Sequence, residues 1–160
     1  MGPTDVKFAA DRMLGRLART LRLLGYDTAY SPDATPESLR KLARDEERTI
    51  LTRGETPQRF RDIEKILSLK SDNPTQQLRE VVEHLRLDAR TGVFTRCTLC
   101  NAPIQRVEKT EVQSLVPPKV FAAYQEFFRC TNCRHVYWRG SHVERILKNL
   151  DALFEQRNKG

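Results

Sequence analysis

The chain of 160 residues has a hydrophobic fraction of 39%, which permits one ordinary domain or a compact domain with a small appendage. No stretch approaches the roughly 18 uninterrupted apolar residues of a membrane span, and the first ten residues do not resemble a secretory signal, so we expect a soluble cytoplasmic protein. The formal net charge of +7 favours a polyanionic partner, and nucleic acid is the polyanion that we expect.

The basic excess is unevenly distributed along the chain. Residues 1–92 hold 17 basic and 15 acidic side chains, whereas residues 93–160 hold 11 basic and 6 acidic ones. A metal ion bound by four thiolates would lower the second balance by two charges. The charge therefore supports nucleic-acid binding.

Short apolar runs recur along the first seventy residues and predict β-strands. Each run is bounded by polar, glycine or proline residues. The strands that we expect cover residues 6–10, 26–30, 48–52 and 66–69.

Helix signals follow each of these runs. Leucines recur every three or four residues from Leu14 to Leu24, and Gly25 is a natural residue to end that helix. Thr35 and Pro36 predict the start of a second helix that reaches about residue 46. The other helices that we expect cover residues 57–63 and 74–86.

Strand and helix thus alternate four times, which is typical of a parallel, doubly wound α/β sheet with helices on both faces. After the segment 87–92 the pattern changes from βα units to cysteine pairs with short strand-like runs. We therefore expect an α/β domain at residues 1–90 and a zinc ribbon with a C-terminal helix at residues 91–160.

The cysteines form two Cys-x2-Cys pairs, Cys97 with Cys100 and Cys130 with Cys133. Each such turn supplies half of a tetrahedral zinc shell, so the two pairs predict one structural zinc ion with no open position for water or substrate. The insert between the pairs is expected to hold strands and a short helix near residues 118–127. Two disulfides would suit a secreted protein, and a redox pair would follow the first strand of a βα unit; neither alternative fits this context.

Acidic residues follow the expected strands at the ends where parallel strands converge. In chain order they are Asp11, Glu37, Glu55 and Asp72. Clustered carboxylates favour Mg²⁺ or Mn²⁺, and such a cation on a basic protein suggests phosphodiester chemistry. Each acid taken alone has a structural alternative, such as a role in a helix cap or on a solvated surface.

Five segments carry a resemblance that covers nearly the whole chain. They are Phe8–Asp27, Thr49–Arg53, Ser71–Leu78, Cys97–Pro103 and Cys130–His142. In their residues and in their order along the chain, these segments resemble the Mut-seven C-terminal RNase domain family, a PIN-like ribonuclease domain with a C-terminal zinc ribbon. The resemblance implies a PIN-like fold whose acidic residues bind Mg²⁺ or Mn²⁺ and cleave RNA.

The resemblance also implies roles for individual acids. Asp11 matches the first acid, Asp72 the acid after the fourth strand, and Glu37 approximately the acid of the second helix. One position departs, because the family reads Leu-Thr-Arg-Asp after the third strand and this chain has Gly54 in place of the acid. The adjacent Glu55 could reach inward, since Gly54 frees the backbone, or point to solvent.

Gly54 leaves two functions open. The first is a metal-dependent endoribonuclease that acts on single-stranded RNA. The second is a catalytically impaired RNA-binding module, for which a ribosome is a candidate partner. A weaker third is an adaptor whose ribbon binds another protein. The sequence does not distinguish rRNA, tRNA and mRNA as the ligand.

Arginines recur at helical spacing opposite the leucines, at Arg12, Arg16, Arg19 and Arg22. They could bind phosphates or form an ordinary solvated helix face.

Residues 134–142 mix cations with Tyr137 and Trp138, and we expect one ring to pack in the core and the other to contact RNA. The candidate RNA-binding residues are Arg12, Arg16, Arg19, Arg53, Arg139 and His142.

Overall fold

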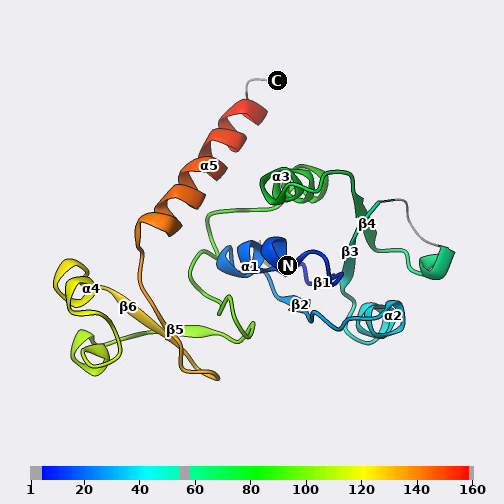
Figure 1. Ribbon diagram of the computed structural model, residues 1–160. Helices are drawn as coiled ribbons and strands as arrows, with labels where there is room; N and C mark the ends of the chain where they lie inside the picture. Colours follow the sequence, from blue (N-terminus) through cyan, green and yellow to red (C-terminus); the bar gives the residue numbers. More distant parts are fainter. Residues whose placement is uncertain (1–4, 55–57, 159–160) are drawn as a thin grey trace. The chain divides into compact units, whose positions relative to one another are not determined.

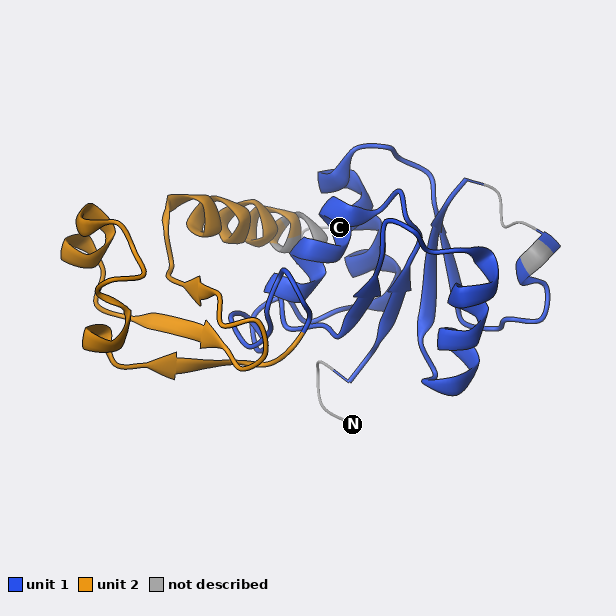
Figure 2. Ribbon diagram, turned by 60° about the horizontal axis from the view of Figure 1, so that its bottom comes forward, with its two compact units in different colours: residues 1–101 blue, residues 102–160 orange. Residues whose placement is uncertain are grey.

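The structure is a computed structural model that describes residues 5–54 and 58–158. The chain forms two compact units, residues 1–101 and residues 102–160 (Figure 2). Within the described residues, no helix has the length and apolar character needed to cross a membrane.

The first unit is built on a four-stranded sheet in which every neighbouring pair is parallel. Its strands are β1 (Phe8–Ala10), β2 (Thr28–Tyr30), β3 (Thr49–Arg53) and β4 (Ile66–Leu69). The order across the sheet is β2-β1-β3-β4. The predicted parallel α/β sheet is therefore confirmed, and all four strands lie within or next to the segments expected for them.

Helices cover both faces of this sheet. α1 (Gly15–Leu23) and α3 (Pro74–Leu85) lie together on one side, and α2 (Pro36–Asp45) lies on the other (Figure 1). The four leucines of the predicted stripe, Leu14 to Leu24, are at most 1% exposed. On the α2 side, Ala9, Leu39 and Ile50 pack with Phe60 of a short 3-10 turn, η1 (Gln58–Phe60).

Local signals set the helix boundaries. The Thr35 side chain accepts a hydrogen bond from the Ser38 backbone, and the Asn73 side chain accepts from two backbone N–H groups of the first turn of α3. Gly25, which follows α1, has a φ of +95°, and a Cβ there would lie 2.2 Å from the carbonyl oxygen of Gly92. Only glycine fits this turn, because both its backbone angle and its contact exclude a side chain.

The second unit contains a three-stranded antiparallel sheet in the order β5-β6-β7. Its strands are β5 (Ile104–Val107), β6 (Phe127–Cys130) and β7 (Val136–Tyr137). The insert between β5 and β6 holds a 3-10 turn, η2 (Lys109–Val112), and the expected short helix, α4 (Pro118–Ala123). The chain continues into α5 (Ser141–Asn158).

Candidate functional site

The four cysteines form the group that best fits a metal. The Sγ atoms of Cys97, Cys100, Cys130 and Cys133 all lie within 4.8 Å of one another, and none of these cysteines forms a disulfide. Four thiolates around Zn²⁺ at about 2.3 Å form a tetrahedron whose sulfurs are about 3.8 Å apart, so this group is compact enough for one ion. The group could therefore bind a structural metal such as zinc, as in a zinc ribbon.

A buried arginine holds the first cysteine pair. Arg22 donates from Nη1 to the carbonyl oxygens of Thr98, at 3.0 Å, and Leu99, at 3.2 Å, and from Nε to the carbonyl of Thr28, at 2.9 Å. Its exposed fraction is only 6%. The prediction that Arg22 joins the solvent-facing arginines is therefore wrong, because its guanidinium group is used to fix the turn between Cys97 and Cys100.

Asn101 fixes the end of the same turn. Its backbone N–H donates to the Cys97 carbonyl at 3.0 Å, and its φ of +72° is one that asparagine tolerates. Its side-chain Nδ2 donates to Oδ1 of Asp27 at 2.7 Å, and its Oδ1 accepts from the Thr28 backbone at 3.0 Å. Residues 97–101 are thereby anchored to the start of β2.

Asp27 is also paired with Arg48, which immediately precedes β3. Arg48 Nη1 lies 2.8 Å from the Asp27 carboxylate and also donates to the Phe8 carbonyl at 3.0 Å. Burial raises the pKa of Asp27, but hydrogen bonds from Arg48 and Asn101 outweigh burial and hold the pKa below its ordinary value. The charged form of Asp27 therefore stabilises the folded state.

We expect Asp27→Asn to lower the free energy of unfolding by about 2 kcal/mol at pH 7, because the hydrogen bonds that Arg48 and Asn101 donate to this half-buried carboxylate would no longer be charge-assisted. The contribution of a carboxylate with a lowered pKa is present above its unfolded pKa of about 3.9 and is lost as the pH falls through the folded pKa. Denaturant unfolding at pH 7 and at lower pH should thus show the difference from the parent protein shrinking in acid. Asp45→Asn, in an exposed pair with Lys41, is the matched control and should change little. An equal loss at every pH would refute this account.

Asp11 lies directly after β1, at the edge formed by the carboxyl-terminal ends of the strands, whereas Asp27 and Arg48 lie at their amino-terminal ends. Its N–H donates to the Leu51 carbonyl at 2.9 Å, which fixes its backbone against β3. Its Oδ1 accepts from the Arg12 backbone at 2.7 Å, and its Oδ2 accepts from the Thr52 hydroxyl at 3.3 Å. The carboxylate is half-buried and held in place from two elements.

Asp72 follows β4 at the same edge. Its carboxylate is 79% exposed and lies 3.7 Å from Nη2 of Arg53, the last residue of β3. Asp11 and Asp72 are thus each engaged by one of two consecutive residues of β3, Thr52 and Arg53.

Two pockets at this edge share Arg12 and Met13. One, of about 190 Å³, is lined by Asp11 together with Thr35 and Phe60. The other, of about 390 Å³, is lined by Asp72 together with Arg16, Tyr30 and Gln77. Each acid therefore faces a hollow that a substrate group could enter, with Arg12 between them.

The remaining predicted acids do not complete a cluster. Glu37 is exposed in the first turn of α2, and Glu55 lies outside the described residues. Within residues 5–54 and 58–158, no three carboxylates come close enough together to hold a metal ion. Gly54 has a φ of +87°, and among the described residues, its chain neighbours apart, no atom lies within 4 Å of the place where its Cβ would be. The missing acid thus leaves open space.

The predicted RNA-binding residues lie on the surface. Arg12, Arg16 and Arg19 are exposed on or just before α1. Arg53 is part of the pair with Asp72. In the second unit, Arg139 and His142 are exposed at the junction between β7 and α5. Arg12 and Arg16 line the pocket that contains Asp72.

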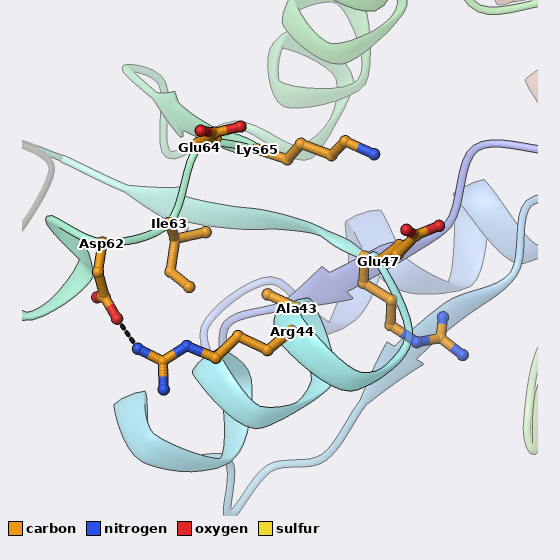
Figure 3. A pocket seen from close by; sticks show the side chains of 8 residues that line it. Ala43, Arg44, Glu47, Asp62, Ile63, Glu64 and Lys65 are labelled. Atoms are coloured by element: carbon orange, nitrogen blue, oxygen red, sulfur yellow. Dashed lines mark ion pairs between the residues drawn. The ribbon is translucent and has the colours of Figure 1, made fainter.

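A separate pocket of about 210 Å³ lies at the amino-terminal edge of the sheet, among residues that precede β3 and β4. Figure 3 shows Arg44 paired with Asp62 at one side and Glu47 at the other, with Glu64 and Lys65 above. The Arg44–Asp62 ion pair occupies one side of this hollow, and neither Asp11 nor Asp72 lines it, so we do not assign it to the candidate site.

Sequence reasoning missed the roles of Asp27, Arg48 and Asn101. Asp27 and Asn101 both fall inside the segments that carried the family resemblance, and that was the available signal. Their contact joins residues 74 positions apart, so no local pattern could reveal it.

Comparison with known proteins agrees with this geometry. A family model, the Mut7-C RNAse domain, matches residues 6–150. A search of curated proteins gives no match. The matched region includes the parallel sheet, Asp11, Asp72 and all four cysteines. The chain therefore belongs to the Mut7-C RNAse domain family, and its function is of the ribonuclease type.

Proposed function

We propose that the protein is an endoribonuclease that cleaves single-stranded RNA at the carboxyl edge of its parallel sheet. The observation that carries the proposal is the position of Asp11, a half-buried carboxylate fixed by Thr52 and bordering a pocket. Functional groups of open α/β sheets gather at this edge. The four cysteines form no disulfide, which fits a cytoplasmic protein, whose RNA would be rRNA, tRNA or mRNA.

Asp11 and Asp72 are the groups that we propose to hold Mg²⁺ or Mn²⁺. One or two carboxylates, completed by water and substrate phosphate, are a common arrangement for Mg²⁺. The bound ion would supply charge stabilisation at the phosphate and a lower pKa for an attacking water. A fuller site would need Glu37 or Glu55.

Arg12 and Arg16 are the groups that we propose to orient the RNA. Both are exposed, and both line the 390 Å³ pocket with Asp72. A guanidinium group binds a phosphate through two parallel hydrogen bonds, so these residues would set the position of the scissile phosphate. Arg19, one turn further along α1, would contact an adjacent phosphate.

A non-catalytic RNA-binding module, for example one bound to a ribosome, is the alternative. Two observations favour it: Gly54 supplies no carboxylate, and Arg53 lies beside Asp72, where it neutralises an acid that would otherwise attract a cation. The adaptor function has no specific observation in its favour.

We expect Gly54→Asp to raise Mn²⁺-dependent cleavage of single-stranded RNA by roughly tenfold or more, because it adds a carboxylate that could bind the ion, and changes to the groups around a bound metal alter its affinity or the activity by about 10- to 100-fold. The side chain has room, although the positive φ would cost about 1–2 kcal/mol of stability. Cleavage rates with Mn²⁺ and Mg²⁺ measure the effect. Mn²⁺ should support the parent protein better, since Mg²⁺ demands near-ideal octahedral geometry.

Gly54→Asn is the matched control, because it has the same shape and backbone strain without the charge. It should be no more active than the parent protein. If neither the parent protein nor Gly54→Asp cleaves RNA with either ion while both bind it, the non-catalytic module is the better description.

A further inference from the structure

The sheet of the second unit has two different faces. On one face, Phe127 packs with Val112, Val116 and Val136. Its ring also lies 6.4 Å from that of Trp138. Of the two aromatic residues expected to divide between packing and contact, Trp138 is thus the one that joins this core.

The opposite face carries a row of side chains across all three strands. Arg106 of β5 pairs with Phe128 of β6, and Phe128 pairs with Tyr137 of β7. Directly opposed residues point to the same side of a sheet, and neighbours along a strand point to opposite sides. Since Phe127 and Val136 face the core, Arg106, Phe128 and Tyr137 face away from it.

His135 extends this row. It lies two residues before Tyr137, and the two rings are in contact, with centroids 4.8 Å apart in an edge arrangement. His135 and Arg134 are exposed, while Phe128 and Tyr137 are half-buried. We call this row of four residues, together with the adjacent Arg134, the ribbon face: Arg106, Phe128, Arg134, His135 and Tyr137.

The charge of the ribbon face suits a polyanion. Residues 102–160 hold ten basic and six acidic side chains. The Arg106 side chain is 68% exposed, and its pairing with Glu126, at 3.5 Å, is a surface contact that a phosphate can replace. Arg134 is exposed and immediately precedes His135, so a second cation is available near that end of the row.

We propose that the ribbon face binds single-stranded RNA, with unpaired bases stacked on the rings of His135 and Tyr137 and phosphates bound by Arg106 and Arg134. Aromatic side chains beside cations are the usual means of holding single strands, because each base has a face to stack and each nucleotide has a charge. Duplex RNA keeps its bases stacked internally and would not use these rings. The proposed function enters only in the choice of RNA as the ligand.

The test is binding of a fluorescent single-stranded RNA, followed by anisotropy, to the full-length chain carrying Asp11→Asn so that the probe is not cut. Arg106→Gln should weaken binding and make the salt dependence of log K shallower by about one. His135→Ala should weaken binding by about tenfold. Lys119→Gln removes an exposed charge that belongs to α4. It is the matched control and should change neither the affinity nor the salt dependence.

Unlabelled single-stranded RNA should displace the probe, and a duplex of the same length should not. The proposal is overturned if Arg106→Gln behaves as Lys119→Gln does, or if the duplex competes equally well. Cleavage is measured separately on the same ribbon-face variants made in the parent protein, which keeps Asp11. If the protein does not cleave RNA but binds it through the ribbon face, the result counts against the proposed function alone. If the protein cleaves RNA but its binding does not depend on the ribbon face, the result counts against this inference alone.

Discussion

Replacement of Asp11 by Asn should lower the rate of RNA cleavage by roughly 100-fold or more, because the anionic oxygen that we propose to bind the cation is lost. Asn keeps nearly the same shape and retains an oxygen that can accept the hydrogen bond from the Arg12 backbone. The substitution therefore removes the charge and leaves the local fold in place. The measurement is the single-turnover cleavage rate of single-stranded RNA in Mn²⁺.

Two comparisons make this result interpretable. Asp45→Asn removes an exposed charge at the end of α2 and should cleave RNA as the parent protein does. Thermal unfolding of the Asp11 variant should stay close to that of the parent protein, since the loss is chemical. If the parent protein and Asp11→Asn show the same residual cleavage, that activity is a contaminant, and the Asp11 edge has no catalytic role.

Removal of zinc should unfold the sheet of the second unit while leaving the parallel sheet folded. We expect one zinc ion per chain, because four thiolates lie within reach of one ion. Binding of a structural zinc contributes on the order of 10–16 kcal/mol, far more than a core as small as Val112, Val116, Phe127 and Val136 can supply. Elemental analysis and amide hydrogen exchange, with and without a chelator, measure the two effects.

The segment from residue 94 to residue 101 should behave differently from the rest of the ribbon. Phe94 donates its N–H to the Leu23 carbonyl, and Arg22 and Asp27 hold the turn that follows. These contacts do not need the metal, so the segment should keep part of its protection after chelation.

Cys130→Ser should reproduce the effect of the chelator, because it removes one ligand. Thr131→Ser, which keeps the hydroxyl bonded to the Pro103 carbonyl, is the matched control and should retain zinc. Uniform loss of protection in both units would show instead that the chain unfolds as a single cooperative body. A metal content near zero in folded protein would show that the second unit does not need zinc to fold.

Local chemistry explains why much of the fold could be predicted from the sequence. Thr35 and Asn73 cap their helices with their own side chains, and β4 occupies the four residues expected for it. The cysteine pairs could also be recognised in the sequence, since a Cys-x2-Cys turn places two thiolates where one zinc ion can bind both. These features depend on residues within a few positions of one another.

Periodicity alone misplaced Arg22. Helical spacing places Arg16 and Arg22 at the same angle, about 120°, from the centre of the leucine stripe, one on each flank, so periodicity does not separate the exposed arginine from the buried one. The polar pattern could not show whether that position meets solvent or protein. The carbonyl groups of Thr98 and Leu99, contributed by a distant segment, decided that it is buried.

The sequence by itself determined the order of strands and helices, the four cysteines that could bind a metal and the acids that follow the strands, because each depends on neighbouring residues. Only the tertiary structure decided which side chains meet. It brought Asn101 to Asp27, set Thr52 against Asp11, and aligned Arg106, Phe128 and Tyr137 on one face. Such contacts join distant parts of the chain, and they form only when burial of the core and pairing of the strands fix those parts together.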